Sequence, residues 1–298
     1  MTTLTETVVD RTDVPFVKAK INYYQDPSEN PDLNGLSTHE IRIQRRREDA
    51  PDVCPLEVDI KNLRGHEADF TLSENGFQVC LLDSALTVWD DEAALKRVYF
   101  PEITELLKRT LGAKHVIQYE HHVRRKTLAE ALAQNSNDAV DISGPVRRLH
   151  IDETPVSARR EFAYYVKDPE LRSRPFGIYN VWKPLRTVRR DPLCLVDART
   201  LAPGDFRVGR VTVPNVGEIE NYSIRAPAES DRDRHRFYFV GGQTEKEALV
   251  FRIFDERHMA VEDKATKFGV AHTSFEDPAT IDLPEARESI EVRSFCIF

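Results

Sequence analysis

Leu149-His150-Ile151-Asp152 is the one place in this 298-residue chain where a histidine is followed two positions later by an acidic residue. If residues 146–152 form a β-strand, their side chains alternate between its two faces, so His150 and Asp152 point the same way. An imidazole and a carboxylate on one face can supply two ligands to a divalent metal. The competing interpretation is a strand histidine that is hydrogen-bonded to a neighbouring carboxylate. The rest of the chain must therefore supply a third ligand.

The composition indicates a globular protein without a general affinity for nucleic acid. Hydrophobic residues make up 40% of the chain and charged residues 31%, which is ordinary for a protein with a sizeable buried core. The net charge of −8 argues against a nucleic-acid binder. The densest basic run, Arg45-Arg46-Arg47, is followed at once by acidic residues and is interpreted as a solvated surface turn.

The cysteines and the N-terminal stretch favour the cytoplasm. The four cysteines are scattered without a C-x-x-C spacing, which fits a reducing compartment and gives no zinc knuckle. Residues 1–15 are polar, without an apolar signal core, and are expected to form a loose tail. No run approaches the roughly 18 apolar residues of a membrane span. We expect a cytoplasmic protein that binds neither a membrane nor nucleic acid, and its oligomeric state stays unknown.

Hydrophobic periodicity and turn signals predict many strands and few helices. Strands are expected at 58–60, 77–82, 116–123, 146–152, 178–182, 193–196, 207–213, 236–240, 248–254 and 289–298. A helix is expected at 90–110, capped by Asp90 and kinked or divided at Pro101. Further helices are expected within 127–141 and at 157–166, the latter started by Ser157, and 24–36 is expected to be a surface loop.

Strands dominate beyond residue 115, and the regular strand–helix alternation of a parallel α/β fold is missing. The expected fold class is therefore mainly β with flanking helices, a double-stranded β-helix of the jelly-roll, cupin-like kind. We expect a single domain over residues 16–298. The absence of a G-x-G-x-x-G or P-loop motif gives no indication of a nucleotide.

Among the eight other histidines, His272 is the best placed to be the third metal ligand. It lies in Val-Ala-His-Thr-Ser-Phe at 270–275, which can be a short strand in the β-rich half. His121 and His122 are adjacent, so only one of them can face inward from a strand. His39, His66, His115, His235 and His258 are expected at the surface, because their neighbours are polar or charged.

Arg287 and Ser289 would share one face of the final strand, with Arg293 further along it. A guanidinium beside a hydroxyl is a natural receptor for a carboxylate, because arginine binds it bidentately and stays charged. The competing interpretation is an edge-strand arginine that is paired to Glu285 or Glu291.

These motifs together resemble one family. An H-x-D, a distal histidine and then Arg-x-Ser is the order seen in Fe(II)/2-oxoglutarate-dependent oxygenases. More specifically, the chain resembles the AsaB-type hydroxylase/desaturases, the gibberellin desaturase and the CmcJ-like proteins of secondary metabolism. The matching stretches are VRRLHIDET at 146–154, YNVWKP at 179–184, PLCLVDA at 192–198, EARESIEVR at 285–293, parts of 70–77, and the aromatic-rich strands within 237–254. Lys183 departs from the arginine expected there.

The resemblance implies a role for each matching residue. His150, Asp152 and His272 would bind Fe(II), the two-histidine, one-carboxylate set that leaves positions open for substrate and O₂. Arg287, helped by Ser289 or Arg293, would bind the distal carboxylate of the cosubstrate 2-oxoglutarate. Asn180 would lie near the metal, and the further residues expected to line the pocket are Trp182, Tyr179, Arg124 and His122. The competing interpretation of Trp182 is a residue of the hydrophobic core, because a buried tryptophan is usually part of the core.

The activity implied by the resemblance is oxidation of a small secondary-metabolism substrate, with release of succinate and CO₂. The outcome would be hydroxylation, desaturation or oxidative cyclisation. Two alternatives stay open at this point. One is a jelly-roll binding module without redox chemistry, and the other is a cupin-type metalloenzyme that uses Zn or Mn in the same ligands.

Overall fold

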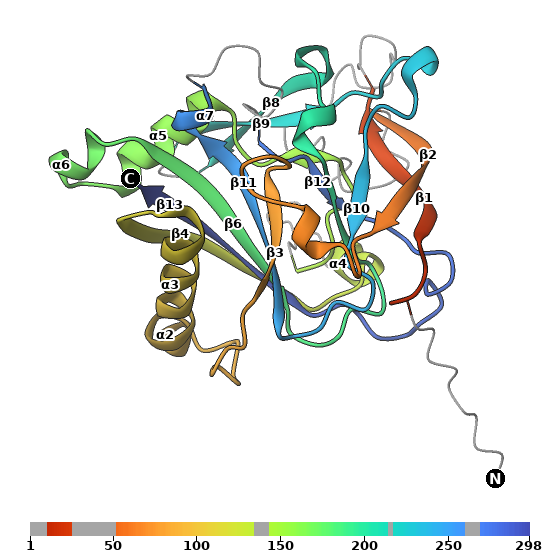
Figure 1. Ribbon diagram of the computed structural model, residues 1–298, viewed down its shortest axis with the longest axis horizontal. Coiled ribbons are helices and arrows are strands. Elements are labelled where there is room, and N and C mark those ends of the chain that lie inside the picture. Colours follow the sequence, from red (N-terminus) through yellow and green to blue (C-terminus); the bar gives the residue numbers. More distant parts are fainter. Residues whose placement is uncertain (1–10, 26–51, 134–142, 214–216, 260–268) are drawn as a thin grey trace.

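The computed structural model describes residues 11–25, 52–133, 143–213, 217–259 and 269–298, and these residues form two packed β-sheets with helices around them (Figure 1). The eight-stranded sheet has the order β1 (Phe16–Tyr24), β2 (Val53–Asn62), β10 (Phe237–Phe239), β7 (Leu193–Val196), β12 (His272–Ser274), β5 (His150–Ile151), β9 (Gly217–Ile224) and β8 (Phe206–Val213). The five-stranded sheet has the order β3 (Phe77–Leu81), β11 (Glu247–Asp255), β6 (Phe176–Pro184), β13 (Ser289–Ile297) and β4 (His115–Arg124).

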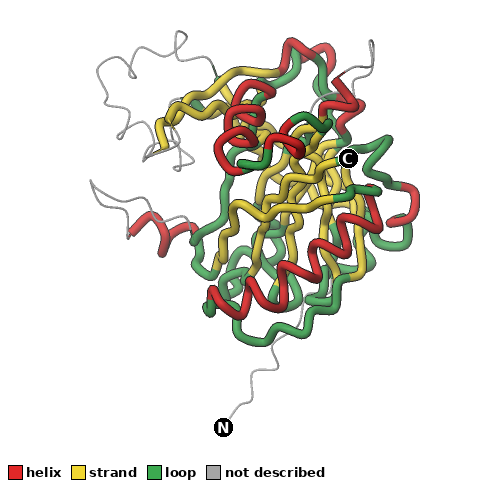
Figure 2. Tube along the Cα trace, turned by 90° about the vertical axis from the view of Figure 1, so that its left-hand side faces the viewer, coloured by secondary structure: helices red, strands yellow, loops and turns green. Residues whose placement is uncertain are grey.

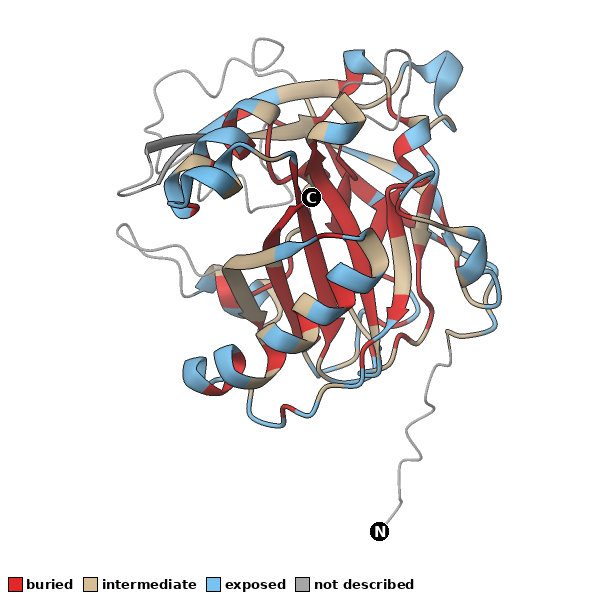
Figure 3. Ribbon diagram, turned by 60° about the vertical axis from the view of Figure 1, so that its left-hand side comes forward, coloured by how far each residue is buried: buried red, intermediate tan, exposed pale blue. Residues whose placement is uncertain are grey.

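The main hydrophobic core lies between the two sheets. It joins residues such as Ile60 and Val196 of the larger sheet to Phe251 and Phe295 of the smaller one. All nine residues of β6 are buried, because helix α3 covers the other face of its sheet (Figure 3). Alternate residues of β6 and β13 therefore point into the core between the sheets or toward the helix.

Two of the described helices have more than ten residues, and the others are shorter. The helices are α2 (Glu92–Ala94), α3 (Phe100–Leu111), α4 (Leu128–Ala133), α5 (Pro155–Tyr165), α6 (Pro169–Arg172) and α7 (Glu256–Met259), with the π-helical turn η4 (Leu95–Tyr99) between α2 and α3. Single 3₁₀ turns are η3 (Glu67–Asp69), η5 (Ala198–Thr200), η6 (Pro203–Asp205) and η7 (Glu229–Asp231). In Figure 2, the longest helix lies across the front of the strands.

The helix predicted at 90–110 is divided, as the proline indicated, but its cap differs. Asp91 caps the helix, since its side chain accepts hydrogen bonds from the amides of Ala93 and Ala94, so the assignment of Asp90 was wrong. Pro101 has no N–H to donate to the carbonyl four residues earlier, and the π-helical turn precedes it. Similarly, Thr154 rather than Ser157 caps α5.

The predicted strands are present, with changes in length and two additions. The predicted strand 146–152 is hydrogen-bonded as a strand only at His150–Ile151, so Asp152 lies directly after β5. Strands β1 and β9 were not predicted. The two strands predicted at 236–240 and 248–254 lie in different sheets, β10 in the larger sheet and β11 in the smaller one. The chain therefore crosses from one sheet to the other between them. The mainly β class with flanking helices is confirmed.

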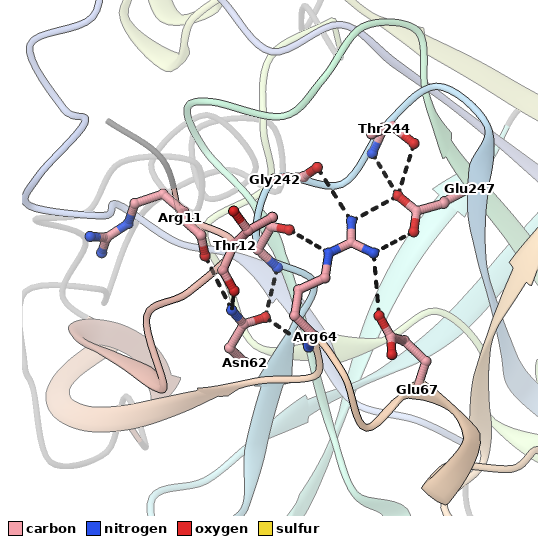
Figure 4. A network of polar contacts seen from close by, with 9 residues as sticks. Arg11, Thr12, Asn62, Arg64, Glu67, Gly242, Thr244 and Glu247 are labelled. Atoms are coloured by element: carbon pink, nitrogen blue, oxygen red, sulfur yellow. Dashed lines mark hydrogen bonds and ion pairs between the residues drawn. The ribbon is translucent and has the colours of Figure 1, made fainter. Parts of the chain in front are cut away.

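The segment that leads into β1 is tied to the sheet by polar contacts (Figure 4). In Figure 4, the Asn62 amide nitrogen donates to the carbonyls of Arg11 and Thr12. It also donates to the Val14 carbonyl, and the Asn62 side-chain oxygen accepts from the Gly241 amide. A β-carbon at Gly241 would lie 2.1 Å from the Arg11 carbonyl oxygen, so only glycine fits there. Residues 11–14, which the sequence placed in a loose tail, are therefore held in place; residues 1–10 lie outside the described residues.

Burial corrects one of the histidines that were expected at the surface. His235 is buried, with its Nε2 3.0 Å from Asp205 Oδ2 and its Nδ1 3.1 Å from the Tyr23 hydroxyl, so its surface assignment was wrong. His66 and His115 are exposed and His258 is partly exposed, whereas His39 lies outside the described residues. Among the described residues, the helices lack the length and apolarity that crossing a membrane requires.

Candidate metal and cosubstrate site

Strand register places the two predicted histidine ligands opposite each other. β5 pairs antiparallel with β12 through His150 and His272, whose ring centroids are 4.4 Å apart. The chain then turns so that Asp152 joins them: His150 Nε2 lies 3.3 Å from its Oδ1 and His272 Nε2 lies 3.7 Å from its Oδ2. The three ligand atoms lie within 4.8 Å of one another, and this is the one such histidine, cysteine or carboxylate group in the described part of the chain.

Hydrogen bonds orient both rings. Nδ1 of His150 lies 2.7 Å from the Arg148 carbonyl oxygen, and Nδ1 of His272 lies 3.2 Å from that of Val270. A carbonyl oxygen only accepts hydrogen bonds, so each Nδ1 carries a proton, and each Nε2 is the ring nitrogen on the side of Asp152. Such carbonyl partners commonly fix the tautomer of metal-binding histidines.

The charge state of the cluster suits a metal. Burial alone would raise the pKa of Asp152, but the Arg293 guanidinium and the two histidines hold that pKa well below its usual range. Burial lowers the pKa of His272 to about 4, against the opposing pull of Asp152. Near pH 7, the group is therefore a carboxylate with a neutral His272, which is the protonation state that metal binding requires.

One oxygen of Asp152 fits a metal directly. Its Oδ1 accepts a hydrogen bond from Arg293 Nη2 at 2.9 Å, whereas its buried Oδ2 has no hydrogen-bond partner. A buried carboxylate oxygen without a partner is costly unless something else satisfies it. The residues present therefore fit a divalent cation between Oδ2 and the two histidine Nε2 atoms.

The cluster opens into a cavity of about 100 Å³, several times the ~15 Å³ that one water molecule needs. Its walls combine cations, carboxylates and a few apolar side chains. They are Arg124, Val146, His150, Asp152, Trp182, Leu193, His272, Thr273, Ser274, Arg287, Glu291 and Arg293. The metal candidate and the predicted anion-binding arginine therefore share one cavity.

Arg287 differs from the other arginines around this cavity. Arg124 pairs with Glu291, Arg293 with Asp152 and Glu120, and Arg147 with Asp191 and Glu276. Arg287 forms no ion pair with a carboxylate of the described residues. It is therefore a buried positive charge without a carboxylate in ion-pair contact. Burial lowers its pKa to about 10, against the opposing effect of the nearby Asp191 and Glu291.

The contacts of Arg287 are neutral and fix its place. Its Nη1 donates to the Asp191 carbonyl at 2.7 Å, its guanidinium carbon lies 5.2 Å from the centre of the Trp182 ring, and its Nε has no partner. Arg287 precedes β13, which lies between β6 and β4, so the edge-strand interpretation was wrong. Neither Glu285 nor Glu291 pairs with it.

Of the other predicted residues, Arg293 and Trp182 line the cavity, whereas Ser289 and Asn180 are not among its lining residues. Arg293 lies in its wall, but its guanidinium is engaged by two carboxylates. Ser289 and Asn180 are fully buried, and their side-chain polar atoms have no partners. Asn180 lies opposite Arg293 in the register of β6 and β13, and Trp182 lines the cavity.

Of the three remaining residues that were predicted to line the pocket, one lines the cavity and two do not. Arg124 lines the cavity, whereas His122 does not and has its Nε2 3.1 Å from Glu120. Tyr179 was predicted to line the pocket, but it occupies the opposite face of β6, where its hydroxyl donates to Asp255 at 2.6 Å. The correction follows from strand alternation, because Tyr179 is odd-numbered and Asn180 and Trp182 are even-numbered.

The sequence missed several residues that shape the site. Thr273 and Ser274 follow His272 in the wall of the cavity, and Glu120 and Asp191 hold the arginines. Strand membership could have indicated Thr273 and Ser274. Nothing in the sequence indicated Asp191, because its role depends on backbone conformation.

Comparisons with known proteins agree with this geometry. A family model described as an oxidoreductase/YMDC permease-like domain matches residues 21–297. The chain is 32% identical to the alpha-ketoglutarate-dependent dioxygenase phiK of Fungal sp., covering 95% of this chain and 96% of that protein. It is 28% identical to the hydroxylase/desaturase efuI of Hormonema carpetanum, covering 94% of each.

A solved structure shares the fold. A variant of the iron and alpha-ketoglutarate-dependent endoperoxidase NvfI superposes with a TM-score of 0.73 at 22% identity, covering 96% of this chain and 98% of that one. This likeness supports the jelly-roll architecture expected from the sequence. From the extent of the sequence matches, the chain belongs to the family of Fe(II)/2-oxoglutarate-dependent dioxygenases that includes the hydroxylase/desaturases.

Proposed function

We propose that His150, Asp152 and His272 bind Fe(II) and that Arg287 binds the distal carboxylate of 2-oxoglutarate in an enzyme that oxidises a small secondary metabolite. The observation that supports this most is a three-ligand cluster in the same cavity as a buried arginine without a carboxylate partner. Iron, when bound with 2-oxoglutarate and O₂, supplies the oxidising power, and succinate and CO₂ are released.

In this proposal, the side chains of the protein bind the metal and the cosubstrate and orient them. Three protein ligands leave coordination positions open for the cosubstrate. Arg287 offers Nε and its second amino group to a carboxylate, a geometry that favours bidentate contact. Arg293 holds Oδ1 of Asp152, which leaves Oδ2 for the metal. The side chains of Trp182 and Leu193 make part of the wall apolar and reduce access of water.

Ser289 and Asn180 are proposed as further contacts to the cosubstrate or its water, because their buried polar atoms lack partners. Arg124, which lines the cavity, remains a candidate for contact with an anionic substrate, whereas His122 does not line it. We propose a small natural product as the substrate, and we propose neither a nucleic acid nor a membrane as a partner. We also propose a cytoplasmic location, which four free cysteines support.

Anaerobic titration with Fe(II) and 2-oxoglutarate tests the proposal. Formation of the ternary complex should give a weak visible charge-transfer band, and aerobic turnover should release succinate. His150→Ala should abolish iron binding. Arg287→Lys should leave iron bound and raise the apparent KM for 2-oxoglutarate, whereas Arg186→Lys, a change at an exposed arginine, is the matched control.

The alternatives predict other results. A binding module without redox chemistry would give neither the band nor succinate. A cupin-type hydrolase would be active with Zn or Mn, and its activity would not depend on Arg287. An Arg287→Lys variant with an unchanged KM for 2-oxoglutarate would contradict the cosubstrate assignment.

A further inference from the structure

Asp191 has an unusual backbone conformation close to the cavity. Its φ is +52°, and it is the one non-glycine residue with positive φ among the described residues. Such a conformation is uncommon outside glycine, although aspartate and asparagine tolerate it better than most residues. Asp191 is buried and precedes Pro192, in the loop between β6 and β7. Strain of this kind persists only where the surroundings enforce it, often at functional sites.

The carbonyl of Asp191 joins the anion-binding arginine to the strand of the metal ligand. It accepts a hydrogen bond from Arg287 Nη1 at 2.7 Å and another from Ser274 Oγ at 3.2 Å. Ser274 is two residues beyond His272 on β12. This carbonyl oxygen, together with a longer direct contact of 3.4 Å from Arg287 Nη1 to Ser274 Oγ, therefore links the position of Arg287 to the strand of His272.

The side chain of Asp191 holds this backbone in place. Its Oδ1 accepts a hydrogen bond from Arg147 Nη2 at 2.5 Å, and its Oδ2 lies 3.5 Å from Arg190 Nε. Arg147 follows Val146, whose carbonyl accepts from the Ser274 amide at 2.8 Å. The segment that leads into His150 therefore anchors Asp191 from the other side.

We propose that Asp191 is a positioning residue for the cosubstrate: its left-handed backbone directs the carbonyl at Arg287, so that the free N–H groups of Arg287 face the cavity. This inference rests on the proposed function, in which Arg287 binds a dicarboxylate. The anchor matters because arginine has a long, flexible side chain and Glu291 in the same cavity offers a competing carboxylate. Asp191 touches neither metal nor cosubstrate and acts through Arg287.

Asp191→Ala tests the inference, because alanine disfavours positive φ and has no carboxylate for Arg147. The apparent KM for 2-oxoglutarate should rise about tenfold or more, the size expected when a hydrogen bond to a charged group is lost. The value of kcat at saturating 2-oxoglutarate and the Fe(II) affinity should stay close to those of the parent. Asp191→Asn should restore most of the affinity, because asparagine tolerates the left-handed conformation and is nearly isosteric. Anaerobic titration of 2-oxoglutarate into the Fe(II) enzyme gives the same comparison without turnover.

If the alanine variant does not fold, Asp191→Gly replaces it. Glycine accepts positive φ but does not enforce it, and it offers no carboxylate to Arg147, so the KM should rise here too. A KM within about twofold of the parent in the folded alanine variant, or in its glycine replacement, would overturn the inference; this is well below the effect expected from losing such a hydrogen bond. If Arg287→Lys raises the KM in the same assay, the proposed function survives that result. If Arg287→Lys also has no effect, the proposed function fails with it.

Discussion

Replacing Arg293 by methionine should destabilise the metal-free protein strongly. The guanidinium lies between Asp152 and Glu120, and methionine keeps most of its volume while it removes the charge. Asp152 is the buried partner, with 4% of its side chain exposed, whereas Glu120 is 36% exposed. The cost should therefore come mainly from Asp152, which would keep its charge in a buried site without the guanidinium.

The magnitude follows from these exposures. Removing one partner of a buried ion pair costs about 3–5 kcal/mol, whereas a largely exposed pair contributes ~0–1 kcal/mol. Arg293 is itself 16% exposed, so we expect a loss near the lower end, about 3 kcal/mol. At about 2–4 °C per kcal/mol for a domain of this size, the melting temperature should fall by roughly 6–12 °C.

The assay is thermal and urea unfolding of the chelator-treated protein at pH 7. Arg174→Met is the matched control, because Arg174 pairs with Glu170 on a helix surface, where 75% of the Glu170 side chain is exposed. This control should change the free energy of unfolding by less than about 0.5 kcal/mol. An Arg293→Met loss below about 1 kcal/mol would refute the reasoning, since it would mean that Asp152 does not depend on the ion pair.

Three further predictions concern other parts of the molecule. The Arg293 guanidinium, opposed by burial, lowers the pKa of Glu120 from its usual 4.5 to about 2, so its contribution to stability is present above pH 4.5 and is lost as the pH falls toward 2. Glu120→Gln should therefore lose less stability than the parent in urea unfolding between pH 5 and pH 3, and an unchanged pH profile would contradict this. Asn62→Ala should lower the free energy of unfolding by about 2–3 kcal/mol, because it removes several hydrogen bonds to the segment before β1, and a loss of only a few tenths would mean that the segment is held by other contacts. A charged thiol reagent should label the native protein at Cys54, which is partly exposed, while the other three cysteines are buried; rapid labelling that persists in Cys54→Ser would count against this burial.

The candidate metal ligands could be identified from the sequence because two of them are close along the chain. His150 and Asp152 are two residues apart, so they stay close in space although the strand ends at Ile151, and His272 lay in a short apolar stretch typical of a strand. The strands β6, β11 and β13 were equally clear, because each is rich in apolar and aromatic residues.

The sequence could not show the features that depend on contacts between distant parts of the chain. Arg287 and Arg293 look alike along the chain, and their difference arises because Asp152 and Glu120 reach only Arg293. The positive φ of Asp191 has no signature in its neighbours, since Pro192 alone indicates only a turn or an extended residue. The strand β1 alternates clearly, but its partner β2 begins almost thirty residues after it ends.

The direct pairing of His150 with His272 has a consequence for how such enzymes diversify. Two of the three ligands are fixed by one step of a backbone ladder, although 122 positions separate them in the sequence. Loops between the two histidines can change in length or in sequence while the pairing of β5 with β12 is kept. The relative position of these two histidines thus depends on main-chain pairing and not on the side chains of the long segment between them.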